Sequence, residues 1–153
     1  MTELERLIKE TETDFFYLNE TSRDVDELID TTSNRQAINI EKAAASQYLS
    51  QFYNGIENTL KRILKYKGIP LPKSSSWHAD LLNYFYQESE EVRIPLFYKE
   101  QFLLLISYRK IRHIIRQGYQ YNLDWEKILI ALSNVSSFLK QFQLIIMNYI
   151  KSE

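Results

Sequence analysis

Glycine and proline are scarce in this sequence, and their scarcity constrains the fold more than any other feature. Only three of each occur among 153 residues. A chain of many short strands needs turn residues at close intervals, and no segment has the two-residue alternation of a half-buried strand. The sequence therefore favours a small number of long helices.

Apolar residues recur at helical spacing in five segments. We expect four long helices and one short one, over residues 2–29, 36–67, 97–117 and 125–151, and over residues 76–87. Ile40 would begin the buried stripe of the second helix. Gly68 and Gly118 stand where helices should end, and Asp124 stands where the last should begin. The expected fold class is all-α, an antiparallel four-helix-type bundle with one additional short helix, in a single domain over residues 1–153.

The composition excludes several classes of function. With no cysteine and two histidines, the chain has no disulfide, no thiolate nucleophile and little with which to build a metal site. The acidic N-terminus does not resemble a signal peptide, and no apolar run approaches the roughly 20 residues that span a bilayer. We therefore expect a cytoplasmic protein with no membrane partner.

Charge is distributed unevenly, although the net charge is only −1. Residues 1–31 contain 10 of the 20 acidic residues and three basic ones. Residues 99–116 contain five Lys or Arg, one His and a single acid. The simplest explanation is that both segments have solvated helix faces. A local positive field can still attract an anion when the total charge does not.

Four basic or histidine side chains of the fourth expected helix share one face. This cationic ridge consists of Arg109, Arg112, His113 and Arg116, at positions i, i+3, i+4 and i+7. The neighbouring face should point into the core, with Leu104, Tyr108, Ile111 and Ile115. Like charges at such spacings destabilise a helix by about 0.2–0.5 kcal/mol per pair. A bound anion such as phosphate, acids of a partner surface, or acids of the first helix within the fold could relieve this repulsion.

The two histidines lead to different expectations. His113 is the only imidazole near the ridge, and its positive neighbours favour the neutral form that a general base needs. Such a base could remove the proton of a ribose 2′-hydroxyl while an arginine holds the phosphate, but for a lone histidine a surface position without a task is the commoner case. His78 follows Trp77 at the start of the short helix, where a packing or capping role is expected.

Three blocks of the sequence resemble the HepT-like branch of the HEPN superfamily. The blocks are YLSQFYNGIENTLKRI (48–63), SSSWHADLL (74–82) and YRKIRHIIRQGYQYNLDWEKI (108–128). Their order and spacing match the family, and the helices expected above agree with it. Members of this superfamily are small helical bundles, and many are metal-independent endoribonucleases.

The resemblance implies roles for particular residues. The family motif is an arginine, four residues, a histidine, one residue and a tyrosine. Arg112 and Tyr119 match its two ends, but Gln117 stands at the histidine position, and glutamine cannot act as a base near pH 7.

The resemblance also implies partners. HepT-like toxins dimerise so that two motif helices form one RNA cleft, and an MNT-type minimal nucleotidyltransferase antitoxin silences them by transferring AMP to the motif tyrosine. For this chain we expect RNA and such an antitoxin as partners, a homodimer or a larger oligomer, no cofactor, and AMPylation of Tyr119. The added phosphate would repel RNA and bind the arginines.

Three explanations of Gln117 stay open. His113 could replace the missing base, the cleft could bind RNA without cutting it, or slow cleavage could depend on positioning and arginine charge. Our first hypothesis is a toxin with endoribonuclease activity, in which Arg112, His113 and Gln117 are catalytic and Arg109 and Arg116 bind flanking phosphates. The second is a catalytically degenerate module that binds RNA, a nucleotide or a partner protein. The third is a structural bundle without a nucleic-acid role.

Overall fold

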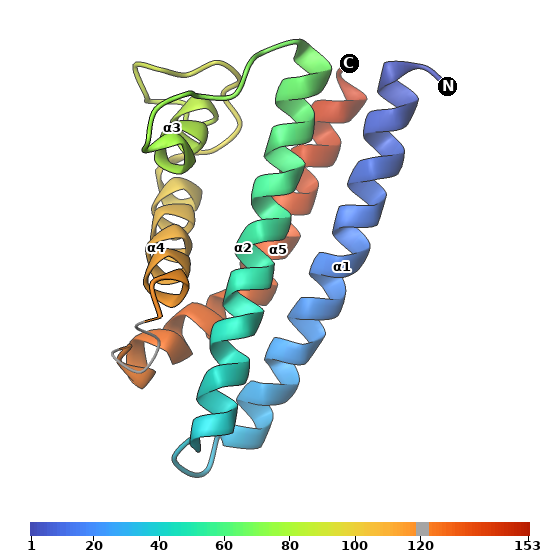
Figure 1. Cartoon of the computed structure of the whole chain (residues 1–153). Helices are drawn as coiled ribbons and strands as arrows, with labels where there is room; N and C mark the ends of the chain where they lie inside the picture. Colours follow the sequence, from blue (N-terminus) through green and yellow to red (C-terminus); the bar gives the residue numbers. More distant parts are fainter. Residues whose placement is uncertain (119–122) are drawn as a thin grey trace.

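The computed structural model describes residues 1–118 and 123–153 (Figure 1). Its helices are α1 (Glu3–Thr32), α2 (Asn39–Lys67), α3 (Trp77–Tyr84), α4 (Lys99–Arg116) and α5 (Trp125–Lys151). Within the described ranges, the only β-type pairing is an isolated bridge between Tyr86 and Phe97. The predicted all-α fold class, with four long helices and one short one, is confirmed.

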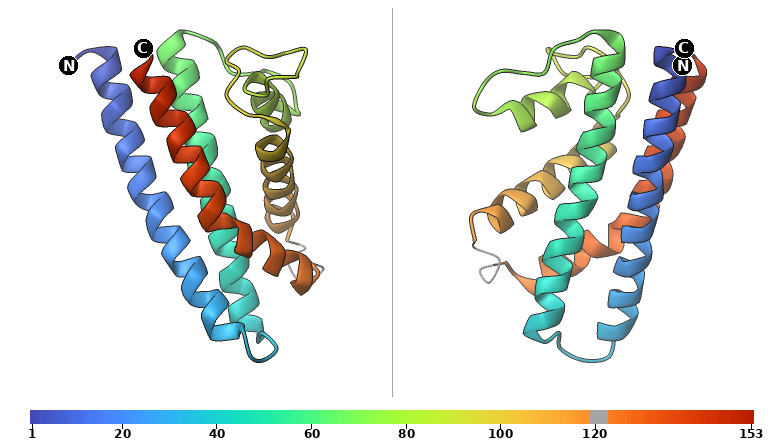
Figure 2. Two further views of the ribbon diagram at one scale, coloured as in Figure 1. Left: turned by 180° about the vertical axis from the view of Figure 1, so that it is seen from behind. Right: turned by 45° about the vertical axis from the view of Figure 1, so that its right-hand side comes forward.

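The core lies where α1, α2 and α5 pack together, as the two views in Figure 2 show. Aromatic side chains fill it: the ring centroids of Phe52 in α2 and Phe138 in α5 are 6.1 Å apart, and both residues are buried. α4 packs against α2 and α3. Figure 1 shows α2 between α4 and α1, so the helix with the cationic ridge and the acidic first helix lie on opposite sides of α2.

The helix boundaries differ from the expected ones by a few residues. α1 continues three residues further, to Thr32, whose hydroxyl donates a hydrogen bond to the carbonyl oxygen of Leu28. α2 begins three residues later than expected, at Asn39. The prediction that Ile40 is buried is wrong, because this residue stands in the first turn of α2 at the end of the bundle and is 77% exposed.

The predicted helix ends have the expected backbone geometry. Gly68 and Gly118 have φ angles of 70° and 80°, a region that residues with a Cβ rarely adopt. The side chain of Asp124 caps α5 by accepting a hydrogen bond from the backbone N–H of Glu126 at 3.1 Å. Ser76 stands at the N-cap position of α3, but its hydroxyl makes no capping bond.

α5 is the one helix in the described part of the chain that is long and apolar enough to cross a membrane, judged by length and composition. The expectation that no segment would reach that threshold is therefore wrong. Its buried side chains, among them Leu132, Phe138 and Phe142, belong to the core that it shares with α1 and α2. A buried core helix often passes this test, so the finding is weak evidence for a membrane span.

Candidate functional site

The buried stripe of α4 consists of apolar residues in its first half and of arginines in its second. Leu105 and Tyr108 are its two fully buried residues. Arg109 and Arg112 follow Leu105 at i+4 and i+7, and both are half-buried. Of the expected core-facing residues, Tyr108 is buried and Leu104 and Ile111 pack against the core, whereas Ile115 is half-buried. The arginines on the neighbouring face are half-buried as well, and Arg112 reaches α2.

Arg112 is held on the surface of α2 by two contacts. Its Nε donates a hydrogen bond to Oδ1 of Asn54. Its guanidinium carbon lies 5.9 Å from the ring centroid of Tyr53, which is fully buried. A cation over an aromatic face is attracted by the ring quadrupole, so both contacts fix the side chain in one orientation. Within the described residues, the remaining guanidinium N–H groups make no hydrogen bond and could bind an anion.

Arg109 lies deeper in the same seam between α2 and α4. Its Nε is buried and has no hydrogen-bond partner among the described residues, and neither has the hydroxyl of Tyr53. Burial raises the pKa of the Tyr53 hydroxyl strongly, and the nearby carboxylate of Glu57 raises it further, whereas Arg109 and Arg112 act in the opposite direction. The hydroxyl therefore stays protonated at physiological pH. It is a potential hydrogen-bond donor or acceptor beside the two arginines.

Glu57 is itself buried, and it is paired with α3 rather than with the ridge. Its exposed fraction is 4%, and its Oε2 lies 2.7 Å from Nδ1 of His78. The ring of His78 stacks on that of Trp77, with centroids 3.7 Å apart, and the ammonium of Lys61 lies 5.4 Å from the indole centroid. His78 thus has the packed position expected of it.

The C-terminal part of the ridge is open to solvent. His113, Arg116 and Gln117 are exposed, and the backbone N–H of Gln117 donates to the carbonyl oxygen of His113 at 3.2 Å. The ridge thus consists of a half-buried pair, Arg109 and Arg112, and an exposed end with His113 and Arg116. The predicted modification site, Tyr119, lies outside the described residues.

Within the described residues, no carboxylate pairs with an arginine of the ridge. The alternative in which acids of the first helix neutralise the ridge is therefore wrong. The most buried acid of that helix, Asp14, pairs instead with Arg62 of α2, whose Nε donates to it at 2.7 Å. Among the described residues, no ion pair compensates the repulsion along α4, so the ridge is either a solvated face or a surface able to bind an anion.

Sequence reasoning did not identify the α2 side of this site. One stretch, YNGIE, contains Tyr53, Asn54 and Glu57. The position of Glu57 beside the buried face of its helix is a signal that could have pointed to this stretch. On a helical wheel, Glu57 falls about 20° beyond Leu64, at the edge of the arc that Leu64 shares with the buried Phe52. A carboxylate at a core position needs a buried partner.

Comparison with known protein families identifies the family of this chain. A family model described as "HepT-like protein" matches residues 44–152, which is more than two thirds of the chain. Neither a curated protein nor a solved structure matches the chain. The match covers α3, α4 and α5 and nearly all of α2, and so it includes every described residue of the site. The chain therefore belongs to the HepT-like family, in the HEPN superfamily.

Proposed function

We propose that this protein is the toxin component of a toxin–antitoxin pair, a cytoplasmic endoribonuclease whose RNA site is the cationic ridge of α4. One observation carries the proposal: Arg109 and Arg112 lie side by side in the α2–α4 seam with no carboxylate partner among the described residues. Two guanidiniums in such a setting favour a ligand with negative charge, and RNA supplies a row of phosphates.

Arg112 is the residue best placed to stabilise charge in a reaction. Its contacts with Asn54 and Tyr53 fix the guanidinium before a substrate arrives. Preorganised donors stabilise a transition state more than mobile ones do, because no reorganisation is needed when the charge develops. Arg109 and Arg116 would bind the phosphates on either side of the scissile one.

The proposed reaction is an internal transfer at phosphorus. The 2′-hydroxyl oxygen of a ribose attacks the adjacent phosphorus, and the bond to the 5′-oxygen of the next nucleotide breaks. His113 takes the 2′-hydroxyl proton and then returns it to the leaving 5′-oxygen. The products are a 2′,3′-cyclic phosphate and a 5′-hydroxyl end. Gln117, four residues after His113 on α4, would orient the phosphate through its amide N–H groups.

Family resemblance supports a composite site made by two protomers. α2 and α3 cover one side of α4, and on its outer side Leu103 is 54% exposed. A second copy packing on this side would bring a second ridge toward the same RNA. The corresponding test is the mass of the protein in solution by light scattering, for the parent and for Leu103→Glu. A monomeric parent would refute the dimer.

The decisive experiment measures RNA binding and RNA cleavage separately. Purified parent, Arg112→Ala, His113→Ala and Gln117→His proteins are incubated with end-labelled tRNA and mRNA, and affinity is measured by anisotropy. Lys9→Ala is the matched control, because it removes one positive charge from an exposed position on α1, which lies on the opposite side of α2 from the ridge (Figure 1). We expect Arg112→Ala to lose both activities, His113→Ala to lose cleavage alone, and Lys9→Ala to keep both.

A non-cleaving module is the second candidate, and Gln117 is the observation that favours it. In this case the parent binds RNA, and its affinity falls in Arg112→Ala, but no cleavage products form. Gln117→His would then create activity by restoring the base of the family motif. Parent protein that neither binds nor cuts RNA would refute both candidates.

We also propose that an MNT-type nucleotidyltransferase antitoxin silences this toxin. A purified MNT-type nucleotidyltransferase, supplied with ATP, would add AMP to Tyr119. The modified protein would be heavier by one adenylyl group in mass spectrometry and would bind RNA more weakly. Tyr119→Phe should abolish the mass increase, and an unchanged increase would refute the assignment of this residue.

A further inference from the structure

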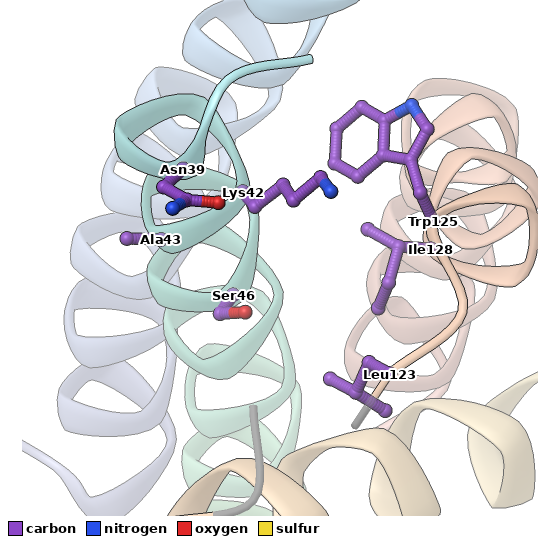
Figure 3. A pocket seen from close by; sticks show the side chains of 7 residues that line it. All are labelled: Asn39, Lys42, Ala43, Ser46, Leu123, Trp125 and Ile128. Atoms are coloured by element: carbon purple, nitrogen blue, oxygen red, sulfur yellow. The ribbon is translucent and has the colours of Figure 1, made fainter. Parts of the chain in front are cut away.

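A small cavity lies between the first turns of α2 and the start of α5, and the ridge does not account for it. Its volume is about 270 Å³, somewhat less than the roughly 300–1,000 Å³ of sites that hold a drug-sized ligand or a cofactor. Figure 3 shows Trp125 on one side of this space and the side chain of Lys42 extending toward it from α2. The size suits a single aromatic group better than a complete cofactor.

The lining of the cavity is chemically mixed. Leu123 and Ile128 contribute apolar surface on the side of Trp125, and α2 contributes the amide of Asn39, the ammonium of Lys42 and the hydroxyl of Ser46. Within the described residues, the side chains of Asn39, Lys42 and Ser46 make no hydrogen bond or ion pair. An indole face, an unpaired cation and free amide and hydroxyl groups are what a planar base attached to a phosphate would need.

The cavity is also close to the exposed end of the ridge. Leu123 follows Gln117 by six residues, and six residues of chain reach at most about 22 Å. In Figure 1 the C-terminal end of α4 and the start of α5 lie at the same end of the bundle. RNA whose phosphates follow α4 past Arg116 would therefore arrive at the cavity within a few nucleotides.

We propose that this cavity is a base-binding subsite that takes one unstacked nucleobase of single-stranded RNA, stacked on Trp125 with its phosphate held by Lys42. The inference rests on the proposed RNA-binding function, and it adds where a base is held and by which residues. Proteins recognise single-stranded RNA mainly through bases that leave the stack and pack on aromatic side chains. The subsite would make the protein prefer single-stranded RNA to a duplex.

The two tryptophans of the chain make a direct test feasible. Trp77→Phe leaves Trp125 as the only indole, and Trp125→Phe leaves Trp77. Full-length protein of each variant is titrated with adenosine monophosphate, with ribose 5-phosphate and with a short single-stranded RNA. We expect adenosine monophosphate and RNA to quench Trp125 fluorescence, ribose 5-phosphate to leave it unchanged, and none of the three to quench Trp77.

Affinity measurements test the same subsite without fluorescence of the protein. Trp125→Leu should weaken binding of labelled RNA about tenfold, the loss of one base–aromatic stack, whereas Trp125→Phe should bind nearly as well as the parent. Lys42→Ala should also weaken binding, and Lys127→Ala should not, because Lys127 is exposed near Trp125 without lining the cavity. Circular dichroism spectra of each variant would serve as the control for folding.

The outcomes separate this proposal from the one on which it rests. RNA binding that depends on Arg112 but is unchanged in Trp125→Leu and Lys42→Ala, with no quenching of Trp125, would overturn the subsite and leave the proposed function intact. Absence of any RNA binding by the parent would overturn both. Equal quenching by ribose 5-phosphate and adenosine monophosphate would also overturn the subsite, because a sugar phosphate carries no base to stack.

Discussion

Replacing Gly55 with alanine should change the free energy of unfolding through two opposing effects, helix propensity and steric contact with Leu18. Gly55 lies in the middle of α2, where alanine should be more stable than glycine by about 0.5–1 kcal/mol from helix propensity. A Cβ at this position, however, would lie 2.6 Å from Cδ2 and 2.9 Å from Cγ of Leu18 in α1. Leu18 is 1% exposed, so its side chain has little room to move.

The steric effect should exceed the propensity effect. Adding a methylene to a filled core costs about 1–3 kcal/mol, and both close atoms belong to a side chain packed between helices. We expect Gly55→Ala to lower the free energy of unfolding by up to about 2.5 kcal/mol, the difference between the two terms. Urea unfolding followed by circular dichroism would show a lower midpoint with an unchanged slope.

A double-mutant cycle isolates the contact with Leu18. Leu18→Ala alone should cost about 2–5 kcal/mol, because it leaves a cavity beside position 55. In that background the added methyl has space, so Gly55→Ala should stabilise the protein by about 0.5–1 kcal/mol. Comparing alanine with glycine at the exposed Gln47 measures the propensity term on the same helix. A more stable Gly55→Ala protein in the parent background would refute the reasoning.

Three further predictions concern polar contacts. His78→Phe leaves the buried carboxylate of Glu57 without its partner, so chemical denaturation should show a loss of about 2–4 kcal/mol, and an unchanged stability would refute the pairing. Tyr108→Phe removes a buried hydrogen bond to a main-chain carbonyl of α5 and should cost about 0.5–1.5 kcal/mol in the same assay. The hydrogen bond from Arg35 is the main reason that the pKa of Glu41 is lowered to about 2, so this pair stabilises the folded state above the unfolded-state pKa and the stabilisation is lost as pH falls toward 2. An NMR titration should find this pKa higher in Arg35→Ala, and a pKa still near 2 would contradict the assignment.

The sequence predicts the helices well because their signals are local. Gly68, Gly118 and Asp124 mark helix ends through backbone geometry and capping, which depend on few neighbours. The misplaced start of α2 has a physical cause: Glu41 accepts a hydrogen bond from the backbone N–H of Ile38 and pairs with Arg35, and these contacts hold the chain extended just before Asn39. Burial of Ile40 depends on those neighbours, which the sequence does not supply.

The candidate site is less predictable because it joins three helices. A helical wheel places the ridge residues on one face, and the structure agrees. The wheel does not say which of these residues pack against α2. Arg109 and Arg112 continue the stripe of Leu105 and Tyr108 and are half-buried, whereas His113 is exposed. Pairing between helices, such as Arg112 with Asn54, depends on their relative rotation, which no local pattern encodes.

The ridge stays uncompensated because of how the nearest buried carboxylate is used. The carboxylate of Glu57 raises the pKa of Tyr53, and Arg109 and Arg112 act in the opposite direction, so all three charged groups lie near the Tyr53 hydroxyl. If Glu57 paired with Arg109, the buried Nε would have a partner and the ridge would lose part of its positive field. His78 binds Glu57 instead, at 2.7 Å. A histidine on α3 thereby occupies the carboxylate that could have paired with a guanidinium on α4, and a residue expected only to pack acquires an indirect electrostatic effect on the ridge that we propose binds RNA.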